Sequence, residues 1–233
     1  MSIIVKNVNK FYGKHQALNN ISFSIKKGEI VGFLGPNGAG KSTMMKILAC
    51  YIDTTEGKVT ICDLCTKKTS NQIRKLIGYL PENNPVYSNM YVKEYLLFLC
   101  RVHNLNKSKI ESIIDKVGLT REQEKKIGEL SKGYKQRIGL AQALIHNPEV
   151  LILDEPTTGL DPNQVIEIRN LIKDIGKEKT VLFSTHIMQE VENICDRVII
   201  INNGKIVADE SIKNIIKNEG SLEKSFQKLT TSS

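Results

Sequence analysis

The nonapeptide GPNGAGKST, residues 35–43, constrains the fold of this chain more than any other stretch. Residues 29–34 before it are apolar and glycine-spaced, which predicts a buried strand, and residues 41–49 continue with helical spacing. A strand, a glycine-rich turn and a helix in this order are the context in which the pattern G-x-x-x-x-G-K-[ST] binds phosphate. The junction therefore predicts an α/β protein with a phosphate site at the end of a strand.

The residue types of this loop suit a nucleoside triphosphate. Glycines let backbone N–H groups turn inward around phosphate oxygens. We expect Lys41 to reach the β- and γ-phosphates, Ser42 to ligate Mg²⁺, and Thr43 to support a phosphate contact. The predicted nucleotide contacts of the loop are Gly35, Pro36, Asn37, Gly38, Ala39, Gly40, Lys41, Ser42 and Thr43.

A second apolar run, VLILDEP at residues 150–156, ends in two acids. Charges in an apolar setting need partners, so we expect a cation at this strand end. Asp154 is predicted to hold Mg²⁺, directly or through water, and Glu155 to orient and deprotonate the attacking water. His186 follows another predicted strand and is expected to hydrogen-bond the γ-phosphate. The remaining histidines have no such context: His15, His103 and His146.

Phosphoryl transfer needs positioning and charge neutralisation more than covalent chemistry, and these residues supply both. A phosphotransferase would also need an acceptor site, and a GTPase an Asn-Lys-x-Asp motif; the sequence carries a signal for neither. We therefore predict ATP hydrolysis, with ATP and Mg²⁺ as cofactors. The predicted catalytic residues are Lys41, Glu155 and His186.

Strands and helices alternate along the chain, except in a helical block at about residues 91–144. This order predicts an α/β fold: a P-loop NTPase (RecA-type) core with a mainly parallel sheet, a small antiparallel N-terminal β-subdomain and an inserted helical subdomain. Residues 212–233 are expected to form a short C-terminal helical tail. We expect the whole chain, residues 1–233, to be one domain.

Composition narrows the class of protein further. Lysine and arginine exceed aspartate and glutamate by 33 − 25, a net charge of +8, but the lysines are scattered, which favours a solvated surface over a nucleic-acid site. No segment approaches the ~18 apolar residues of a membrane span, and the charged N-terminus is unlike a signal peptide. The five cysteines are separated, which fits reduced thiols in the cytosol. Cys62 and Cys65 lack the second pair of ligands that structural zinc needs.

The stretch LSKGYKQRIGLAQAL, residues 130–144, is predicted to be a helix with a polar, basic start. Ser131 sits at the turn and Gly133 follows without a side chain. A helix N-terminus presents free backbone N–H groups and suits an anion. The chain thus carries a second candidate phosphate site besides the glycine-rich loop.

Together these ordered motifs resemble the ATP-binding subunits of ABC transporters, from Tyr12 to about Asp209. The resemblance implies that LSKGYKQ stands at the family's LSGGQ signature, where Ser131 and Gly133 would cap the γ-phosphate of ATP held by a second, head-to-tail subunit. It implies that Tyr12 stacks on adenine. Residues 159–161, including Asp161, match the loop that touches the partner subunit, and residues 80–86 match the loop that contacts the membrane subunit and reaches Mg²⁺ through Glu82.

Two positions depart from the family's pattern. Lys132 and Tyr134 replace the usual Gly and Gln of the signature, while Ser131 and Gly133 are kept, so phosphate binding is expected to survive. Glu82 replaces the usual glutamine. A carboxylate still ligates Mg²⁺ but cannot donate an amide hydrogen bond, so we expect it to change how hydrolysis is coupled to transport.

The resemblance implies an ATPase that powers export through a separate membrane permease and that pairs with a second ATP-binding subunit as a homodimer. The variant motifs are similar to those of the multidrug and gliding-motility exporter branch. Such a subunit lies in the cytoplasm at the inner face of the cell membrane, and no nucleic acid is expected as partner. Two alternatives remain: a soluble ABC protein that acts on nucleic acid or ribosomes, and a cassette that binds ATP without hydrolysing it.

Overall fold

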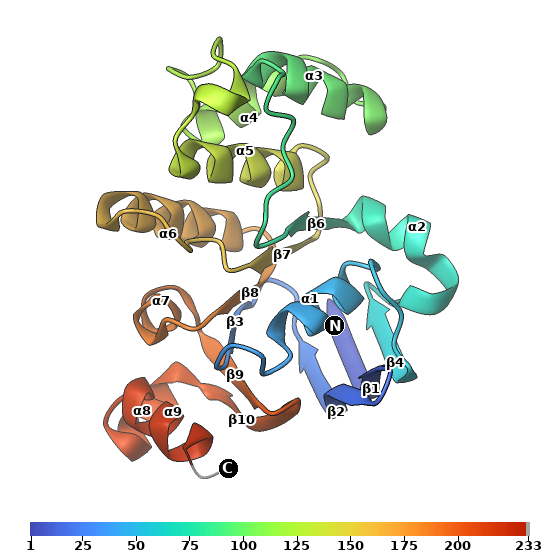
Figure 1. Cartoon of the computed structure of the whole chain (residues 1–233), viewed down its shortest axis with the longest axis vertical. Helices are drawn as coiled ribbons and strands as arrows, with labels where there is room; N and C mark the ends of the chain where they lie inside the picture. Colours follow the sequence, from blue (N-terminus) through green and yellow to red (C-terminus); the bar gives the residue numbers. More distant parts are fainter. Residues whose placement is uncertain (232–233) are drawn as a thin grey trace.

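A six-stranded sheet forms the centre of the structure, a computed structural model in which residues 1–231 are described (Figure 1). Its strand order is β10-β9-β3-β8-β7-β6, and all neighbouring pairs run parallel except β10 and β9. This confirms the predicted mainly parallel sheet. The strands are β3 (Ile30–Leu34), β6 (Ile77–Leu80), β7 (Val150–Asp154), β8 (Thr180–Thr185), β9 (Arg197–Asn202) and β10 (Lys205–Ser211).

A smaller sheet of four strands, ordered β2-β1-β4-β5, is antiparallel throughout and confirms the predicted N-terminal sheet (Figure 1). Its first two strands form a long hairpin whose tip pairs Tyr12 with His15. The hairpin tip reaches the nucleotide cleft described below. The strands are β1 (Ile3–Tyr12), β2 (His15–Ile25), β4 (Glu56–Ile61) and β5 (Leu64–Cys65).

The central strands are buried on both faces, because one hydrophobic core lies on each side of the sheet. In β3, Val31 and Phe33 belong to the core shared with α1 (Lys41–Leu48) and the smaller sheet, whereas Leu34 belongs to the core shared with α6 (Pro162–Gly176). Alternate side chains of a strand point to opposite faces. Strands covered on both faces are continuous apolar runs, which explains the composition of β3 and β7.

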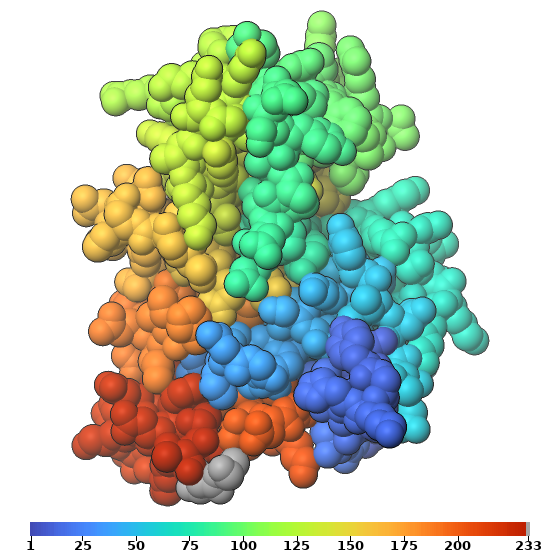
Figure 2. Space-filling view, viewed as in Figure 1, coloured from blue at the N-terminus to red at the C-terminus, as the bar shows by residue number. Residues whose placement is uncertain are grey.

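The predicted helical block forms one end of the molecule, and the C-terminal helices lie at the other end (Figures 1 and 2). The buried side chains of the block continue the core beneath α6, so the block packs on the sheet's covering layer. The elements of the block are α3 (Val92–Val102), α4 (Lys109–Lys116), a 3-10 turn (Ile127–Glu129) and α5 (Lys132–Leu144), and those at the far end are α8 (Ile212–Glu219) and α9 (Leu222–Thr230). Helix α7 (Met188–Ile194) lies between α6 and this far end and packs on β3 and β8 (Figure 1).

Helix α2 (Thr66–Leu76) is an element that the sequence pattern does not predict. Its sequence, TKKTSNQIRKL, is mostly polar, and its buried residues are Thr66 and Ile73. Hydrophobic periodicity is the main sequence signal for a helix, and here too few apolar residues recur to produce it. The helix packs on β4, β5 and β6, so tertiary contacts stabilise it.

The contact between α5 and β6 gives a first prediction. An added Cβ at Gly78 of β6 would collide with the carbonyl oxygen of Ala143 in α5, a backbone atom that cannot move aside. We expect Gly78→Ala to lower the free energy of unfolding by about 2 kcal/mol, measured by urea denaturation. Gln72→Ala on the exposed face of α2 is the control, expected to change it by less than about 0.5 kcal/mol. A wild-type urea midpoint for Gly78→Ala would contradict this contact.

Candidate nucleotide-binding site

The glycine-rich loop joins β3 to α1 through two residues in the left-handed region. Gly38 has φ 80° and Gly40, the residue before α1, has φ 108°. Side chains rarely adopt these angles, and an added Cβ at Gly40 would also lie 2.7 Å from the carbonyl oxygen of Ala17. The loop therefore ends at the N-terminus of α1, where free N–H groups suit phosphate oxygens.

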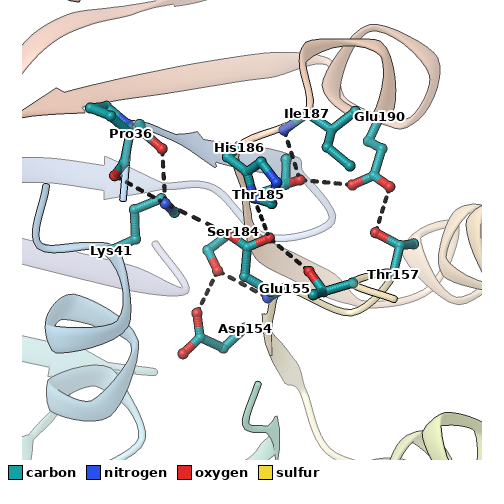
Figure 3. Close-up of polar contacts among 12 residues, drawn as sticks. Pro36, Lys41, Asp154, Glu155, Thr157, Ser184, Thr185, His186, Ile187 and Glu190 are labelled. Carbon is teal, nitrogen blue, oxygen red and sulfur yellow. Dashed lines mark hydrogen bonds and ion pairs between the residues drawn. The ribbon is translucent and has the colours of Figure 1, made fainter. Parts of the chain in front are cut away.

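Lys41, the first residue of α1, is buried and links the loop to the acidic strand end (Figure 3). Its Nζ donates to the carbonyl oxygens of Gly35 (2.8 Å) and Pro36 (3.2 Å). The same Nζ lies 3.5 Å from Oε1 of Glu155. A buried ammonium and a buried carboxylate need each other as partners, so Lys41 and Glu155 are fixed together.

Asp154 ends β7 and is only 1% exposed. Its Oδ1 accepts hydrogen bonds from Ser184 Oγ (2.6 Å) and Ser42 Oγ (3.2 Å). Burial raises the pKa of the Asp154 carboxyl, and the two hydroxyl donors oppose that rise. A hydroxyl oxygen of the phosphate loop and a carboxylate oxygen thus meet, which is the oxygen chemistry that Mg²⁺ prefers.

Glu155 adopts φ 51°, an uncommon angle for a residue with a side chain. Its N–H bonds to Ser184 of β8, with the carbonyl oxygen at 3.2 Å and Oγ at 3.1 Å. Its Oε2 accepts from Thr158 Oγ1 (3.1 Å) and lies 3.0 Å from Nδ1 of His186. Strained backbone of this kind persists where the surroundings enforce it, and here it accompanies a carboxylate held between Lys41 and His186 (Figure 3).

Lys41, Ser42, Glu155 and His186 line one cleft of about 540 Å³, and Asp154 adjoins it through its hydrogen bond from Ser42. The helix N-terminus and Lys41 fit phosphate oxygens, and the Ser42 hydroxyl with the Asp154 carboxylate fits a hard cation. The donor set of the chain therefore suits a magnesium-bound triphosphate. The cleft is lined by Tyr12, His15, Ala17, Asn37, Gly38, Gly40, Lys41, Ser42, Thr43, Glu82, Glu155, Thr158 and His186.

Some predicted site residues lie outside the lining. Gly35 packs against the backbone of Ile201, and Pro36 and Ala39 complete the loop without facing the cleft. Ser131 caps α5, accepting from the N–H of Tyr134 at 3.5 Å. Two others contact or cap helix α6: Gly133, where an added Cβ would lie 2.5 Å from Gln164, and Asp161, which accepts from the Gln164 N–H at 3.0 Å. Asp154, the predicted Mg²⁺ ligand, is also outside the lining, and its Oδ1 lies 3.2 Å from Oγ of the lining residue Ser42.

The cleft also contains residues that the sequence patterns did not single out: His15, Ala17 and Thr158. His15 lies in it because it pairs with Tyr12 across the hairpin tip. A hairpin-turn pattern around Gly13 would have been the only signal for that pairing. Thr158 follows the acidic pair too closely to be distinguished from other loop threonines by sequence.

Lys132, a departure from the expected signature, lies over the loop after β7. An added Cβ at Gly159, which has φ 73°, would collide with Nζ of Lys132. The side chain also lines a second cavity of about 360 Å³ with Glu82 and Thr158. The Lys132 side chain therefore contacts its own chain's loop at residues 158–159, and Glu82 borders both cavities.

The rest of the described chain adds no further metal site. Cys62 and Cys65 are free, half-buried thiols, and burial raises the pKa of the Cys62 thiol. Residues 1–231 hold no cluster of three His, Cys, Asp or Glu side chains that would bind a metal ion. Within the same range no helix combines the length and apolar character needed to cross a membrane.

A phosphate loop, a buried carboxylate pair and a histidine at one edge of a parallel sheet define a P-loop ATPase. Comparison with known proteins identifies the family within this class: residues 18–158 match the family described as "ABC transporter". The chain is 42% identical over 206 residues to the uncharacterized ABC transporter ATP-binding protein YxlF of Bacillus subtilis, covering 87% of this chain and 68% of that protein. It is 39% identical to the bacitracin transport ATP-binding protein BcrA of Bacillus licheniformis, covering 90% and 70%.

Solved structures agree. The ATP binding subunit of an ABC transporter superposes with a TM-score of 0.88 at 26% identity, covering 98% of this chain and 99% of that one. The dimeric cassette MJ0796, in a post-hydrolysis state bound to ADP and Pi, superposes with a TM-score of 0.82 at 29% identity, covering 90% and 98%. The chain therefore belongs to the ABC transporter family as an ATP-binding cassette and is an ATPase.

The buried acid gives a second prediction. Because the folded state favours protonated Asp154, its contribution to stability is lost as pH rises through the aspartate range, and at neutral pH the buried charge is destabilising. We expect Asp154→Asn to raise the free energy of unfolding of the ligand-free protein by about 1 kcal/mol. It should also abolish the rise in melting temperature caused by MgATP, both measured by thermal denaturation.

The matched control is Asp174→Asn, which removes an exposed carboxylate paired with Lys177. Exposed pairs contribute little, so this variant should keep both the wild-type stability and the full response to MgATP. A lower melting temperature for Asp154→Asn at pH 7 would show that the Asp154 carboxylate is stabilised rather than penalised in its site.

Proposed function

We propose that this chain hydrolyses ATP with Mg²⁺, as the ATP-binding subunit of a transporter that works with a second cassette. The observation that carries the proposal is the Glu155 carboxylate, buried in the cleft between Lys41 and His186. Groups held in this way near a phosphate-binding loop fit the geometry of a general base. Residues 1–233 are proposed to act as one ATP-binding unit.

Each group has a separate task in the proposed reaction. Lys41 and the loop N–H groups neutralise phosphate charge, and Ser42 with Asp154 and Glu82 would hold Mg²⁺, which supplies further neutralisation when bound. Glu155 orients the attacking water and accepts its proton. His186 holds the Glu155 carboxylate through Nδ1, 3.0 Å away, and lines the cleft where a γ-phosphate would lie.

Tyr12 is proposed to bind the base of the nucleotide. It stands at the hairpin tip, is 47% exposed, and lines the same cleft as the phosphate loop. Aromatic faces of this kind stack on nucleobases. The Lys10 ammonium lies 5.3 Å from the ring centroid and fixes one side of the ring, which leaves stacking to the other.

Ser131 and Asp161 support the proposed head-to-tail dimer, because neither lines the cleft of its own chain. Both start helices, α5 and α6, and both are exposed. An anion of a second copy would meet free N–H groups and the positive end of the α5 dipole at Ser131. The dimeric form of the cassette MJ0796 supports this arrangement.

We also propose that the membrane-spanning part of the transporter is a separate permease and that transport is export. BcrA is named for bacitracin transport, and the relative SrtF of Streptococcus pyogenes, 35% identical over 94% of this chain, for lantibiotic transport. A cytoplasmic position at the inner face of the membrane follows from such a partnership. These relatives favour a transporter over the alternative that acts on nucleic acid.

The shared site gives a third prediction. Glu155→Gln keeps the size of the side chain but removes its basicity, so hydrolysis should fall by at least about a hundredfold. ATP then stays bound, and we expect a shift from monomer to dimer only with MgATP, measured by size exclusion with light scattering. This experiment tests the proposed function directly.

Two double variants serve as controls for that dimer. Lys41→Ala added to Glu155→Gln should stay monomeric with MgATP, because phosphate binding is lost. Ser131→Ala added to Glu155→Gln should bind ATP as a monomer with unchanged affinity but dimerise less. A Glu155→Gln protein that remains monomeric with MgATP would refute the homodimer, and unchanged hydrolysis would refute the general base.

Glu82 gives a fourth prediction. It borders the phosphate cleft, so its charge repels ATP without Mg²⁺, and this repulsion is offset by attraction to the cation when Mg²⁺ is bound to the ATP. Glu82→Gln should tighten binding of Mg-free ATP by about threefold and reduce the preference for MgATP, since one unit of nearby charge is removed. Titration with a fluorescent ATP analogue, with magnesium or with a chelator, measures both affinities. If the ratio of MgATP affinity to Mg-free ATP affinity were equal in the two proteins, Glu82 would be too far from the phosphates to act on Mg²⁺.

A further inference from the structure

Glu190 is a fully buried carboxylate that the proposed reaction does not use. It lies in the first turn of α7 and is 0% exposed. Oε1 accepts from Thr157 Oγ1 at 2.5 Å, and Oε2 accepts from Thr185 Oγ1 at 2.8 Å (Figure 3). Both donors are neutral hydroxyl groups rather than a cation. A buried carboxylate is costly without strong hydrogen bonds, so each of its oxygens is tied to one threonine.

The two threonines lie next to the groups proposed to react. Thr157 follows Glu155 by two residues, in the loop after β7, and Thr185 is the last residue of β8, directly before His186. Thr185 Oγ1 also accepts from the N–H of Ile187 at 3.1 Å, so its hydroxyl fixes both sides of His186. Glu190 therefore bridges one loop to the other, beside the direct contact between His186 and Glu155.

A purely local role for Glu190 does not explain this arrangement. An acidic residue in the first turn favours a helix through its dipole, but here both carboxylate oxygens are bound to side chains outside α7. Thr157 is distant in sequence and belongs to a different strand end. Packing alone would be met by an apolar residue of the same size, which would leave both threonine hydroxyls without these partners.

We propose that Glu190 is a positioning residue that holds the Glu155 and His186 loops in a fixed relation, through Thr157 and Thr185. The inference rests on the proposed function, in which Glu155 is the general base. With the bridge intact, Thr158 donates to Glu155 Oε2 and His186 contacts the same oxygen. When the bridge is removed, the two segments are no longer held together through Glu190. The Glu155 carboxylate is then less well oriented toward the attacking water.

The test uses the full chain with Thr157→Val, which has the shape of threonine and lacks the hydroxyl. We expect kcat for ATP hydrolysis to fall about tenfold with KM within about twofold, because the loss is in positioning rather than in binding. Thr157→Ser restores the hydroxyl and should restore kcat. Glu190→Gln keeps one acceptor oxygen. Its kcat should therefore lie between that of Thr157→Val and that of the wild type.

A second readout needs no hydrolysis. Hydrogen exchange of the Ile187 amide, followed by NMR in the nucleotide-free protein, reports on the far side of the bridge from residue 157. We expect Thr157→Val to speed that exchange about tenfold, since Glu190, the partner of the Thr185 hydroxyl, then loses the hydrogen bond that holds its other oxygen. If Thr157 made only local contacts, its replacement would leave the exchange rate of the Ile187 amide unchanged.

The matched control is Thr180→Val at the other end of β8. Thr180 is equally buried, and its Oγ1 bonds to Ser2 Oγ (2.9 Å) and to the N–H of Gly28 (3.0 Å), away from the cleft. It should lower the melting temperature while leaving kcat and Ile187 exchange at wild-type values. A change in kcat equal to that of Thr157→Val would mean that general destabilisation explains both, and would overturn the proposal.

The remaining outcomes separate the bridge from the reaction. If the Ile187 amide of Thr157→Val exchanges at the wild-type rate, the proposed bridge through Glu190 is refuted, whatever the hydrolysis rate. Faster exchange with wild-type kcat also overturns the proposal, because the bridge would then be structural only. A wild-type protein that releases no phosphate overturns the proposed function and this role of Glu190 with it, and the exchange of Ile187 distinguishes that failure from the loss of the bridge.

Discussion

The parallel register of β3, β8 and β7 is the constraint on which the rest of the site depends. Asp154 pairs with Ser184, and Leu34 pairs with Thr185, so three strands end at the same edge of the sheet. Parallel strands bring their carboxyl ends together, and ligands bind there. The phosphate loop, the acidic pair and His186 come from distant parts of the sequence. They meet because the parallel hydrogen-bond pairing of β3, β8 and β7 places their strand ends side by side.

Charge balance at that edge follows from the same register. Lys41, Asp154 and Glu155 are all buried, and such groups are tolerated only with partners. Lys41 pairs with Glu155, while Asp154 receives the hydroxyls of Ser42 and Ser184. This leaves an oxygen-rich site with a raised carboxyl pKa beside a phosphate-binding helix. A cation and a triphosphate would complete that balance, which would link the stability of the ligand-free protein to its proposed activity.

The helical end of the molecule places a different group of residues. Gly133 lets α5 approach Gln164 of α6, and Lys132 lies over Gly159. The start of α5 thus contacts the loop that follows Glu155, the proposed general base, within one chain. Ser131, the residue proposed to meet a second copy's nucleotide, directly precedes Lys132 in the chain. Few residues therefore separate the proposed nucleotide cleft of one chain from the surface at Ser131 that is proposed to contact a second copy.

The sequence by itself determined the class of site: the pattern of residues 35–43, the acidic pair after an apolar run and the strand-end histidine fix the chemistry through residue types and spacing. It also determined the parallel sheet, because strands buried on both faces must be apolar throughout. Only the tertiary structure placed His15 and Thr158 in the cleft, formed the polar helix α2, and joined Glu190 to two threonines. These depend on contacts between segments far apart in the chain, and local periodicity carries no record of such contacts.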